Sequence, residues 1–372
     1  MTVMPGSDTP AVFAPGATIG IIGGGQLGRM TATAAAQLGY RSHVFCQSPD
    51  EPAAQVAHQT TIATFENTGA LDRFAADIDV ATLEFENIPL ESVEYLEARI
   101  AVRPNSGALA IAQDRVKEKD FVTAAGIATA PYHAITDSCE LASAVANLGT
   151  PAILKTARLG YDGKGQVRIE PSTDLDAAWA NSGAGISTGG AILEGFIEFE
   201  REISVIAARA TDGAQASYVP VENRHANHIL AETTVPAPIS GDTAAAATNV
   251  ARRLIENLEI VGLLTVEMFV ARNGSVLVNE IAPRPHNSGH WTIDACAISQ
   301  FELLVRTVCG LPLGSTERHA DATMKNLIGD DVDNWQTYLA DPATRLHLYG
   351  KAETRPGRKM GHVTWLIPRA QP

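Results

Sequence analysis

The chain has 372 residues, of which 45% are apolar and 19% charged, an ordinary composition for a globular protein of two or three domains. Its formal net charge of −14, from 28 basic and 42 acidic residues, argues against a nucleic-acid or anionic-membrane partner. The four cysteines have no C-x-x-C or zinc-finger spacing and are typical of reduced thiols in a cytoplasmic protein. No apolar run approaches the roughly 18 residues of a transmembrane helix. Residues 1–16 lack the pattern of a signal peptide and are expected to be a disordered leader.

The first predicted unit is a βαβ element, with a strand over 18–22, a helix over 29–38 and a strand over 43–46. A G-x-G-x-x-G turn over 23–28 joins the first strand to the helix, and such a turn lets an anion approach a helix N-terminus. Dinucleotide binding also requires an acidic residue at the end of the second strand, where this chain has Cys46-Gln47-Ser48. We therefore favour a phosphate-bearing substrate at this helix terminus over NAD.

A strand over 80–87 places Glu84 and Glu86 on one face, because side chains alternate along a strand. An acid at the C-terminal end of a parallel strand often contacts a ligand, and a solvated strand end is the alternative. A short strand over 101–105 and a helix over 107–125 follow. On composition alone, the basic residues of this helix are expected to be solvated: Arg115, Lys117 and Lys119.

A helix over 138–148 precedes a strand over 151–155 that ends on Lys155. The next segment, 156–166, has glycines at 160, 163 and 165 around Lys164, and its backbone N–H groups can cover a polyphosphate. Lys155 is a point charge suited to phosphate oxygens. The segment is not a Walker A motif, so it favours nucleotide binding of another kind, and a flexible loop without a ligand is the alternative.

The remaining elements are expected in the order strand 191–197, strand 200–208, helix 242–260, helix 299–308 and short strands over 322–328 and 345–349. Gly195 interrupts the first of these strands and leaves a backbone edge that can meet adenine. His225 lies in a His- and Asn-rich loop, where a lone histidine is more often structural.

Two β-rich runs flank Asn273-Gly274, a strong signal for a hairpin with a type I′ turn. Counting outward from that turn places Glu267 opposite Glu280 on one face. Like charges at this spacing are destabilising unless neutralised, and two carboxylates facing one gap suit Mg2+. A solvated edge hairpin is the alternative, and the polar loop that follows disfavours it, because it contains Arg284, His286, Asn287 and His290.

Several of these motifs resemble the ATP-grasp superfamily: Lys155 with loop 160–166, segment 194–197, Glu267 and Asn279-Glu280. Four segments, 25–30, 160–166, 283–292 and 355–362, resemble the N5-carboxyaminoimidazole ribonucleotide synthase family of purine biosynthesis, and the match extends over residues 17–365. The resemblance implies an α/β fold with α+β parts. Its expected domains are a Rossmann-like preATP-grasp domain (17–113), an ATP-grasp domain (114–312, with a lid at about 127–195) and a small β-rich C-terminal domain (313–372).

The resemblance also implies an activity, namely ATP- and bicarbonate-dependent carboxylation of 5-aminoimidazole ribonucleotide through carboxyphosphate, with Mg2+ as cofactor. A cytoplasmic homodimer that hands its product to a mutase is expected. The nearest alternative is another ATP-grasp ligase of purine metabolism, such as a formate-dependent transformylase. Two alternatives from other classes are a nicotinamide oxidoreductase, suggested by 23–28, and a non-catalytic nucleotide-binding regulator.

Specific roles follow from the resemblance. Lys155 is expected at the ATP phosphates, 194–197 at adenine and Glu202 at the ribose. The full ATP set is Arg115, Lys155, Gly160, Tyr161, Asp162, Gly163, Lys164, Gly165, Gln166, Glu194, Gly195, Phe196, Ile197, Glu202, His225, Asn279 and Glu280. The metal ligands are Glu267 and Glu280. The aminoimidazole ribonucleotide contacts are Gln26, Leu27 and Glu84, with Lys351 and Arg358 at its 5′-phosphate. The reaction centre comprises Tyr161, Asp162, Arg284, His286 and Asn287.

Overall fold

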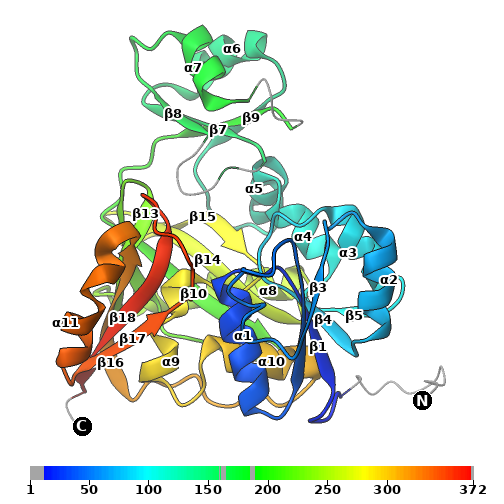
Figure 1. Cartoon of the computed structure of the whole chain (residues 1–372). Helices are drawn as coiled ribbons and strands as arrows, with labels where there is room; N and C mark the ends of the chain where they lie inside the picture. The colour runs from blue at the N-terminus through cyan, green and yellow to red at the C-terminus, as the bar shows by residue number, and fades with distance from the viewer. Residues whose placement is uncertain (1–11, 159, 161–164, 185–188, 370–372) are drawn as a thin grey trace.

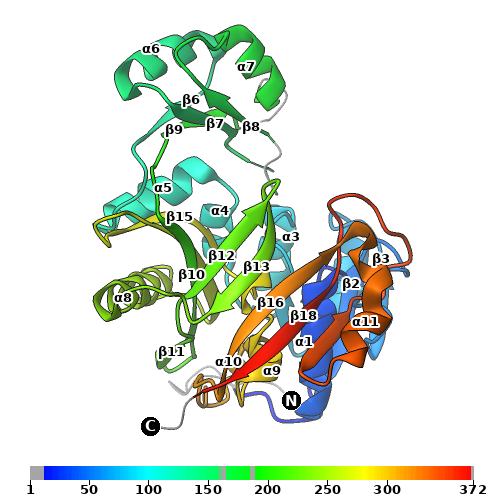
Figure 2. The same cartoon turned by 90° about the vertical axis from the view of Figure 1, so that its left-hand side faces the viewer.

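The computed structural model describes residues 12–158, 160, 165–184 and 189–369. A broad body contains a parallel N-terminal sheet and a large antiparallel sheet side by side, and a smaller unit, here called the lid, stands above them (Figure 1). Figure 2 shows the same lid in profile, with the β12–β13 hairpin of the body reaching toward it. The helices in the described part of the chain are too short or too polar to cross a membrane.

The N-terminal sheet has five parallel strands in the order β3-β2-β1-β4-β5. Its strands are β1 (Thr18–Ile22), β2 (Arg41–Cys46), β3 (Gln59–Ile62), β4 (Val80–Leu83) and β5 (Ala101–Val102), and its first helices are α1 (Gln26–Gln37), α2 (Thr68–Ala76) and α3 (Leu90–Glu97). The central strands are continuous buried apolar runs, as expected for a parallel sheet covered on both faces. The predicted βαβ unit is confirmed.

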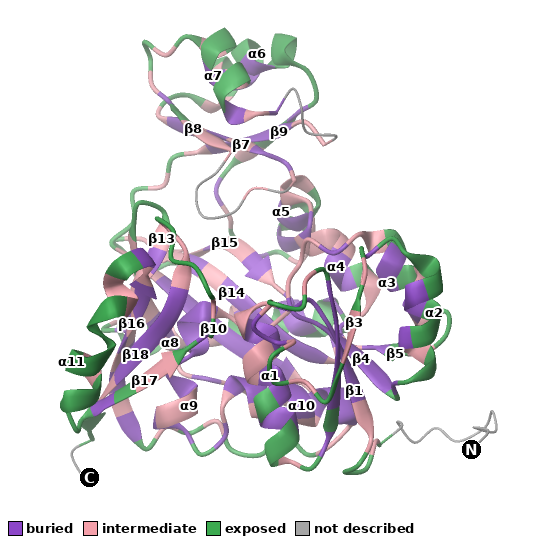
Figure 3. Ribbon diagram, viewed as in Figure 1, coloured by how far each residue is buried: buried purple, intermediate pink, exposed green. Residues whose placement is uncertain are grey.

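The lid is a four-stranded antiparallel sheet in the order β6-β9-β7-β8. Its elements are β6 (Tyr132–Ile135), α6 (Ser138–Leu148), β7 (Ala152–Thr156), β8 (Gln166–Ile169), α7 (Leu175–Ser182) and β9 (Ala191–Gly195). The lid has its own apolar core, which includes Leu141, Leu154 and Leu193. Figure 3 shows that the outer surfaces of α6 and α7 are largely exposed. The prediction of a helix over 138–148 is confirmed.

The large sheet has nine strands in the order β15-β14-β10-β12-β13-β16-β18-β17, with β11 paired to β10. Its strands are β10 (Arg201–Arg209), β11 (Gln215–Ser217), β12 (Val221–Ala226), β13 (Ile229–Val235), β14 (Gly262–Val270), β15 (Val276–Ala282), β16 (Ala320–Ile328), β17 (Thr344–Leu348) and β18 (Lys359–Pro368). The C-terminal strands therefore extend the sheet that bears the predicted carboxylate pair. They join it where β16 pairs with β13.

The helices around this sheet in the described part of the chain include α4 (Ser106–Ala112), α5 (Arg115–Ala124), α8 (Gly241–Asn257), α9 (Thr292–Ala295), α10 (Gln300–Cys309) and α11 (Trp335–Ala340). The long helix α8 buries Ala247, Ala251 and Leu254 in the same core as Val205 of β10 and Val266 of β14. Its apolar positions recur at the spacing of one helix face, which fixes α8 against the sheet.

The prediction of one helix over 107–125 is wrong, because α4 and α5 are separate. Asp114 has extended backbone angles, and its side chain accepts hydrogen bonds from the N–H groups of Val116 and Lys117. An aspartate that can cap a new helix competes with continuation of the old one. Lys119 is only 1% exposed, so its predicted solvation is also wrong.

The expectation of a disordered leader over 1–16 is contradicted for its described end. The Phe13 N–H donates to the carbonyl oxygen of Cys309 at 2.9 Å, and the Tyr40 hydroxyl donates to the Phe13 carbonyl oxygen at 2.7 Å. Phe13 also packs against the main hydrophobic core. One aromatic residue with two backbone hydrogen bonds is enough to attach this segment to the body. Residues 1–11 lie outside the described residues.

The β14–β15 hairpin has the predicted Glu267–Glu280 pairing but not the predicted turn. The Gly274 N–H donates to Ala271 O at 2.8 Å, and the Ala271 N–H donates to Ser275 O at 2.9 Å, so the loop has three residues. Gly274 has φ +82°, whereas Asn273 is not among the residues with positive φ. Further along, Met268 pairs with Val278 and Glu267 with Glu280, so Asn279 is the extra residue of a β-bulge.

Candidate active site

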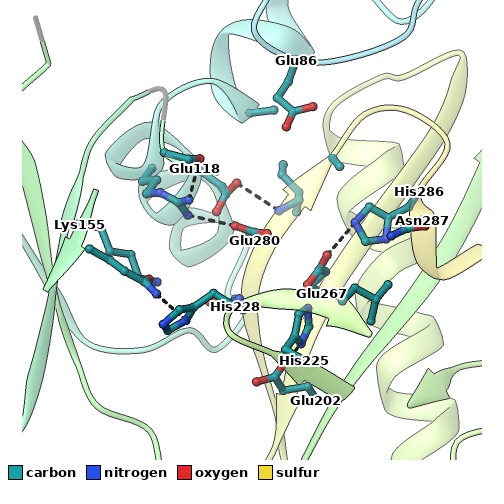
Figure 4. A pocket seen from close by; sticks show the side chains of 18 of the residues that line it. Glu86, Glu118, Lys155, Glu202, His225, His228, Glu267, Glu280, His286 and Asn287 are labelled. Carbon is teal, nitrogen blue, oxygen red and sulfur yellow. Dashed lines mark hydrogen bonds and ion pairs between the residues drawn. The ribbon is translucent and has the colours of Figure 1, made fainter. Parts of the chain in front are cut away.

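A cavity of about 640 Å³ lies where the lid, the N-terminal sheet and the large sheet meet (Figure 4). All three units contribute to its wall. Of the residues predicted from the sequence, those that line it are Gln26, Leu27, Glu84, Arg115, Lys155, Gly160, Gln166, Glu194, Gly195, Phe196, Ile197, Glu202, His225, Glu267, Asn279, Glu280, Arg284, His286 and Asn287.

The carboxylate pair forms one wall of the cavity, and each member contacts a basic side chain. Arg115 Nη1 lies 3.0 Å from Glu280 Oε2, and His286 Nε2 lies 2.8 Å from Glu267 Oε1. Burial alone would raise the pKa of Glu280, but the charges of Arg115 and Lys155 outweigh it and lower that pKa to about 2. Glu280 is therefore ionised at neutral pH and available to a cation.

The donor set beside this pair fits a hard divalent cation. Asn279 precedes Glu280, and its Oδ1 atom is buried without a hydrogen-bond partner in the described part of the chain. A buried carbonyl oxygen without a donor is costly, and a metal ion is one way to satisfy it. Together with Glu267 and Glu280 it offers only oxygen ligands, the type that Mg2+ prefers.

On the lid, Lys155 of β7 contacts Glu194 of β9, with Nζ 2.8 Å from Oε2. The buried Lys119 lies 3.8 Å from the other carboxylate oxygen. Burial opposes ionisation of Glu194, but the charges of Lys155 and Lys119 lower its pKa below the ordinary value. The lid wall thus holds a fixed negative carboxylate next to a lysine, beside the backbone of 195–197.

Below the lid, Glu202 of β10 and His225 of β12 form a pair with His225 Nδ1 2.5 Å from Glu202 Oε2. Burial lowers the pKa of His225, but the Glu202 carboxylate outweighs this effect and raises it. The pair therefore favours the imidazolium form of His225. The prediction that His225 lies at the site is consistent with its place in the cavity wall.

The carboxylate of Glu84 occupies the N-terminus of α1. Leu27 N–H donates to Glu84 Oε1 at 3.2 Å, and a Cβ atom at Gly25 would collide with this carboxylate. Burial raises the pKa of Glu84, although Arg284 and the backbone N–H groups of the turn lower it in part. A side chain of the chain itself thus caps this helix terminus, and the phosphate-bearing substrate expected there stays a prediction.

Arg284 lies between the two sheets and forms a two-pronged ion pair with Glu86, which follows β4. The sequence predicts that Glu86 shares a face with Glu84 but implies no role for it. Among the cavity residues without a predicted role are Gln113, Glu118 and His228. His228 Nδ1 lies 2.9 Å from Gln166 Nε2 of the lid. Only long-range contacts identify these residues, so no local motif could have revealed them.

Some predicted residues are not among those that line the cavity. Lys351 Nζ donates to Lys359 O at 2.7 Å, and Arg358 Nη1 donates to Glu353 O at 2.9 Å. Lys359 of the same segment does line the cavity, so Lys351 and Arg358 are close to it. Gly165, with φ +74°, is described but does not line it. The predicted residues that lie outside the described residues are Tyr161, Asp162, Gly163 and Lys164.

The fold and this site belong to the ATP-grasp class. The sequence matches an ATP-grasp domain over residues 120–301, a ribonucleotide synthetase preATP-grasp domain over 16–113 and a phosphoribosylaminoimidazole carboxylase C-terminal domain over 322–371. The N5-carboxyaminoimidazole ribonucleotide synthase of Brucella melitensis biotype 1 is 51% identical over 355 residues, which cover 95% of this chain and 98% of that protein. The chain belongs to the N5-carboxyaminoimidazole ribonucleotide synthase family.

Two solved structures are similar over nearly the whole chain. The N5-carboxyaminoimidazole synthetase of Staphylococcus aureus complexed with ADP has a TM-score of 0.92 at 37% identity and covers 97% of this chain and 96% of its own. The Aspergillus clavatus synthase, in complex with ADP and 5-aminoimidazole ribonucleotide, has a TM-score of 0.86 at 29% identity, with 95% and 94% covered. The predicted fold class and family are confirmed.

Proposed function

We propose that this chain uses ATP and bicarbonate to carboxylate 5-aminoimidazole ribonucleotide to N5-carboxyaminoimidazole ribonucleotide in de novo purine biosynthesis. The observation that carries this proposal is the single cavity in which three groups meet. These are the Glu267–Glu280 pair, Lys155 of the lid, and the Glu86–Arg284 pair next to Glu84. The family membership of the chain and the ligands of the Aspergillus clavatus structure support it.

ATP is proposed to bind between the lid and the large sheet. The backbone of 194–197 lies at the adenine, and Glu202, held by His225, accepts hydrogen bonds from the ribose hydroxyls. Lys155 and Arg115 face the phosphates as positive charges. Loop 160–166 covers the phosphates with its backbone N–H groups in this proposal.

Mg2+ is proposed to be held by Glu267 and Glu280, with Asn279 beside them, since their oxygen atoms suit it. When bound, the ion would neutralise charge on the phosphates during phosphoryl transfer. Arg115 and His286 then stabilise the two carboxylates from the protein side, at 3.0 Å and 2.8 Å.

In the proposed reaction a bicarbonate oxygen attacks the γ-phosphorus of ATP, the bond to the β-phosphate oxygen breaks, and carboxyphosphate and ADP form. Carboxyphosphate releases phosphate and CO2, and the exocyclic amine attacks CO2 and loses a proton to give the carbamate. Arg284 binds the carboxylate-like groups, and His286 and Asn287 lie beside it. Asn287 suits such a ligand, because its side-chain nitrogen and oxygen lack hydrogen-bond partners within the described residues.

Aminoimidazole ribonucleotide is proposed to contact Gln26, Leu27 and Glu84, with its 5′-phosphate at Lys351 and Arg358. Glu84 is a fixed acceptor at the end of the cavity nearest α1. Closure of loop 160–166, with Tyr161 and Asp162 at the reaction centre, is proposed to keep water from carboxyphosphate. A labile carbamate product favours direct transfer to a mutase. We also propose a homodimer in the cytoplasm, where the four free cysteines stay reduced.

Release of phosphate from ATP with Mg2+ tests the proposal directly. Release should require both aminoimidazole ribonucleotide and bicarbonate, and should match the amount of carbamate trapped. If release with both compounds equals the blank, the assignment is wrong. Formate in place of bicarbonate distinguishes the transformylase alternative, which should work only with formate.

A further inference from the structure

We propose that Glu86 is a positioning residue that fixes the guanidinium of Arg284 for the carboxylate-like reactants. This proposal rests on the proposed function, which places Arg284 at the reaction centre. The two residues come from different sheets, since Glu86 follows β4 of the N-terminal sheet and Arg284 follows β15 of the large sheet. Their contact therefore links the part of the cavity proposed for aminoimidazole ribonucleotide to the part proposed for the ATP phosphates.

The hydrogen bonds of Arg284 leave part of its guanidinium for a ligand. Glu86 Oε2 pairs with Nε and Glu86 Oε1 with Nη2 at 3.0 Å, and Nη1 donates to Pro285 O at 3.0 Å. A guanidinium has five N–H donors, so these contacts use three of them. In the part of the chain that the structure describes, the other two have no acceptor. The remaining donors, one on Nη1 and one on Nη2, are available to a carboxylate-like anion such as bicarbonate or carboxyphosphate.

Glu86 is itself held in place. Gln113 Nε2 donates to the carbonyl oxygens of Glu86 at 2.7 Å and Ile88 at 2.6 Å, which fixes the loop after β4. Gln113 Oε1 accepts a hydrogen bond from Arg158 Nη2 at 3.0 Å. Arg158 follows β7 of the lid. The position of the Glu86 carboxylate is thus set by contacts from both the body and the base of the lid.

Arg284 needs a fixed partner because other carboxylates of the cavity also attract its guanidinium. Burial disfavours the charge of Arg284, and the carboxylates of Glu86, Glu84 and Glu280 together outweigh it and raise the pKa of Arg284. Burial also opposes ionisation of Glu86, yet the charge of Arg284 keeps its pKa below the ordinary value. Without the Glu86 carboxylate, the guanidinium is drawn toward Glu280, where it would neutralise a proposed metal ligand, or toward Glu84. Glu86 keeps it away from both.

The substitution Glu86→Gln preserves the volume of the side chain and removes its charge and one acceptor. We expect the kcat of carboxylation to fall about 10- to 100-fold, as misplacement of one reacting group commonly does. The KM for ATP should change less than about twofold, and more phosphate should be released per carbamate formed, because carboxyphosphate is no longer held for transfer. Glu86→Asp keeps the charge with a shorter reach and should lie between these values. Glu94→Gln, an exposed glutamate of α3, is the matched control.

Chemical rescue separates positioning from a structural role. In Arg284→Ala, added guanidinium ion should restore part of the carboxylation, because Glu86 still supplies a two-pronged acceptor. In the double variant Arg284→Ala, Glu86→Gln the same ion should restore nothing, with KCl as the control salt. Equal rescue in both variants, or a normal ratio of phosphate to carbamate in Glu86→Gln, would overturn the role of Glu86. Absence of carbamate from the wild-type protein would instead overturn the proposed function and this role with it.

Discussion

The substitution Glu280→Gln tests the carboxylate pair on which the proposed chemistry depends. The change removes one negative charge and exchanges one carboxylate oxygen for an amide nitrogen, while the amide oxygen can still accept the hydrogen bond from Arg115 at about the present 3.0 Å. Repulsion between Glu280 and the facing Glu267 disappears at the same time. The lowered pKa of Glu280 indicates that its attraction to Arg115 and Lys155 outweighs this repulsion, so the free energy of unfolding should fall by about 1 to 2 kcal/mol.

Activity should respond far more strongly than stability. Removal of one preorganised group that stabilises transition-state charge typically lowers kcat by about 10² to 10³, or about 2.7 to 4 kcal/mol. The assay is ADP formation at saturating aminoimidazole ribonucleotide and bicarbonate, with Mg2+ varied. In parallel, the rise in Tm caused by Mg2+ with ADP should be smaller in Glu280→Gln than in the wild type. Glu256→Gln on α8 is the control of equal charge change. Near-normal kcat with an unchanged Mg2+ response would refute the assignment.

Three further changes test other parts of the site. Burial and the charge of Arg358 lower the pKa of Lys351 to about 8, so kcat/KM for aminoimidazole ribonucleotide should fall above pH 8 as Lys351 loses its charge. In Lys351→Arg, which stays charged, this decrease above pH 8 should be smaller. A wild-type kcat/KM that does not change above pH 8 would contradict the role of Lys351. Burial raises the pKa of Glu118 from 4.5 to about 8 in the folded protein. As the pH rises, the carboxyl therefore loses its proton in the unfolded state before it does in the folded state. The free energy of unfolding should accordingly decrease between about pH 4.5 and pH 8. Glu118→Gln should therefore raise Tm at pH 8.5 more than at pH 5, measured in EDTA, and an equal shift at both would argue otherwise. His225→Ala should raise the KM for ATP about tenfold with a smaller change in kcat, because Glu202 loses its partner; an unchanged KM would exclude this role.

The sequence predicts correctly those helices and strands whose apolar pattern and end signals all lie within the element itself. The strand over 18–22 and the helix over 138–148 have the predicted bounds, since a buried apolar run and an N-capping aspartate mark them. The break between α4 and α5 depends on a competition between Gln113-Asp114 and helix continuation, which composition does not resolve. The joining of β16 to β13 depends on pairing between residues about 90 positions apart, and no local signal specifies it.

The same distinction applies to the site. Residues in recognisable motifs, such as Lys155 and Arg284, lie in the cavity as expected. The sequence predicts a solvated Lys119 and assigns no role to Glu118, yet both are buried, because α5 packs its charged face against β15. A helix sequence shows which residues share a face but not whether a partner covers that face. Buried polar residues are therefore the part of this site that only tertiary structure reveals.

The predicted pairing of Glu267 with Glu280 is correct although the hairpin departs from the prediction in two ways, its loop length and a β-bulge, which offset each other. A type I′ turn would place Arg272 opposite Ser275, whereas the observed three-residue loop places Ala271 there and shifts the register by one. With that register continued, Glu280 would lie opposite Val266 and point into the core, because a slip of one residue exchanges the two faces of a strand. The bulge at Asn279 restores the count and returns Glu280 to the cavity beside Glu267. The bulged residue also brings its own oxygen to the same place. The extra residue in β15 thus brings the three oxygen-bearing side chains of the proposed Mg2+ site to one place.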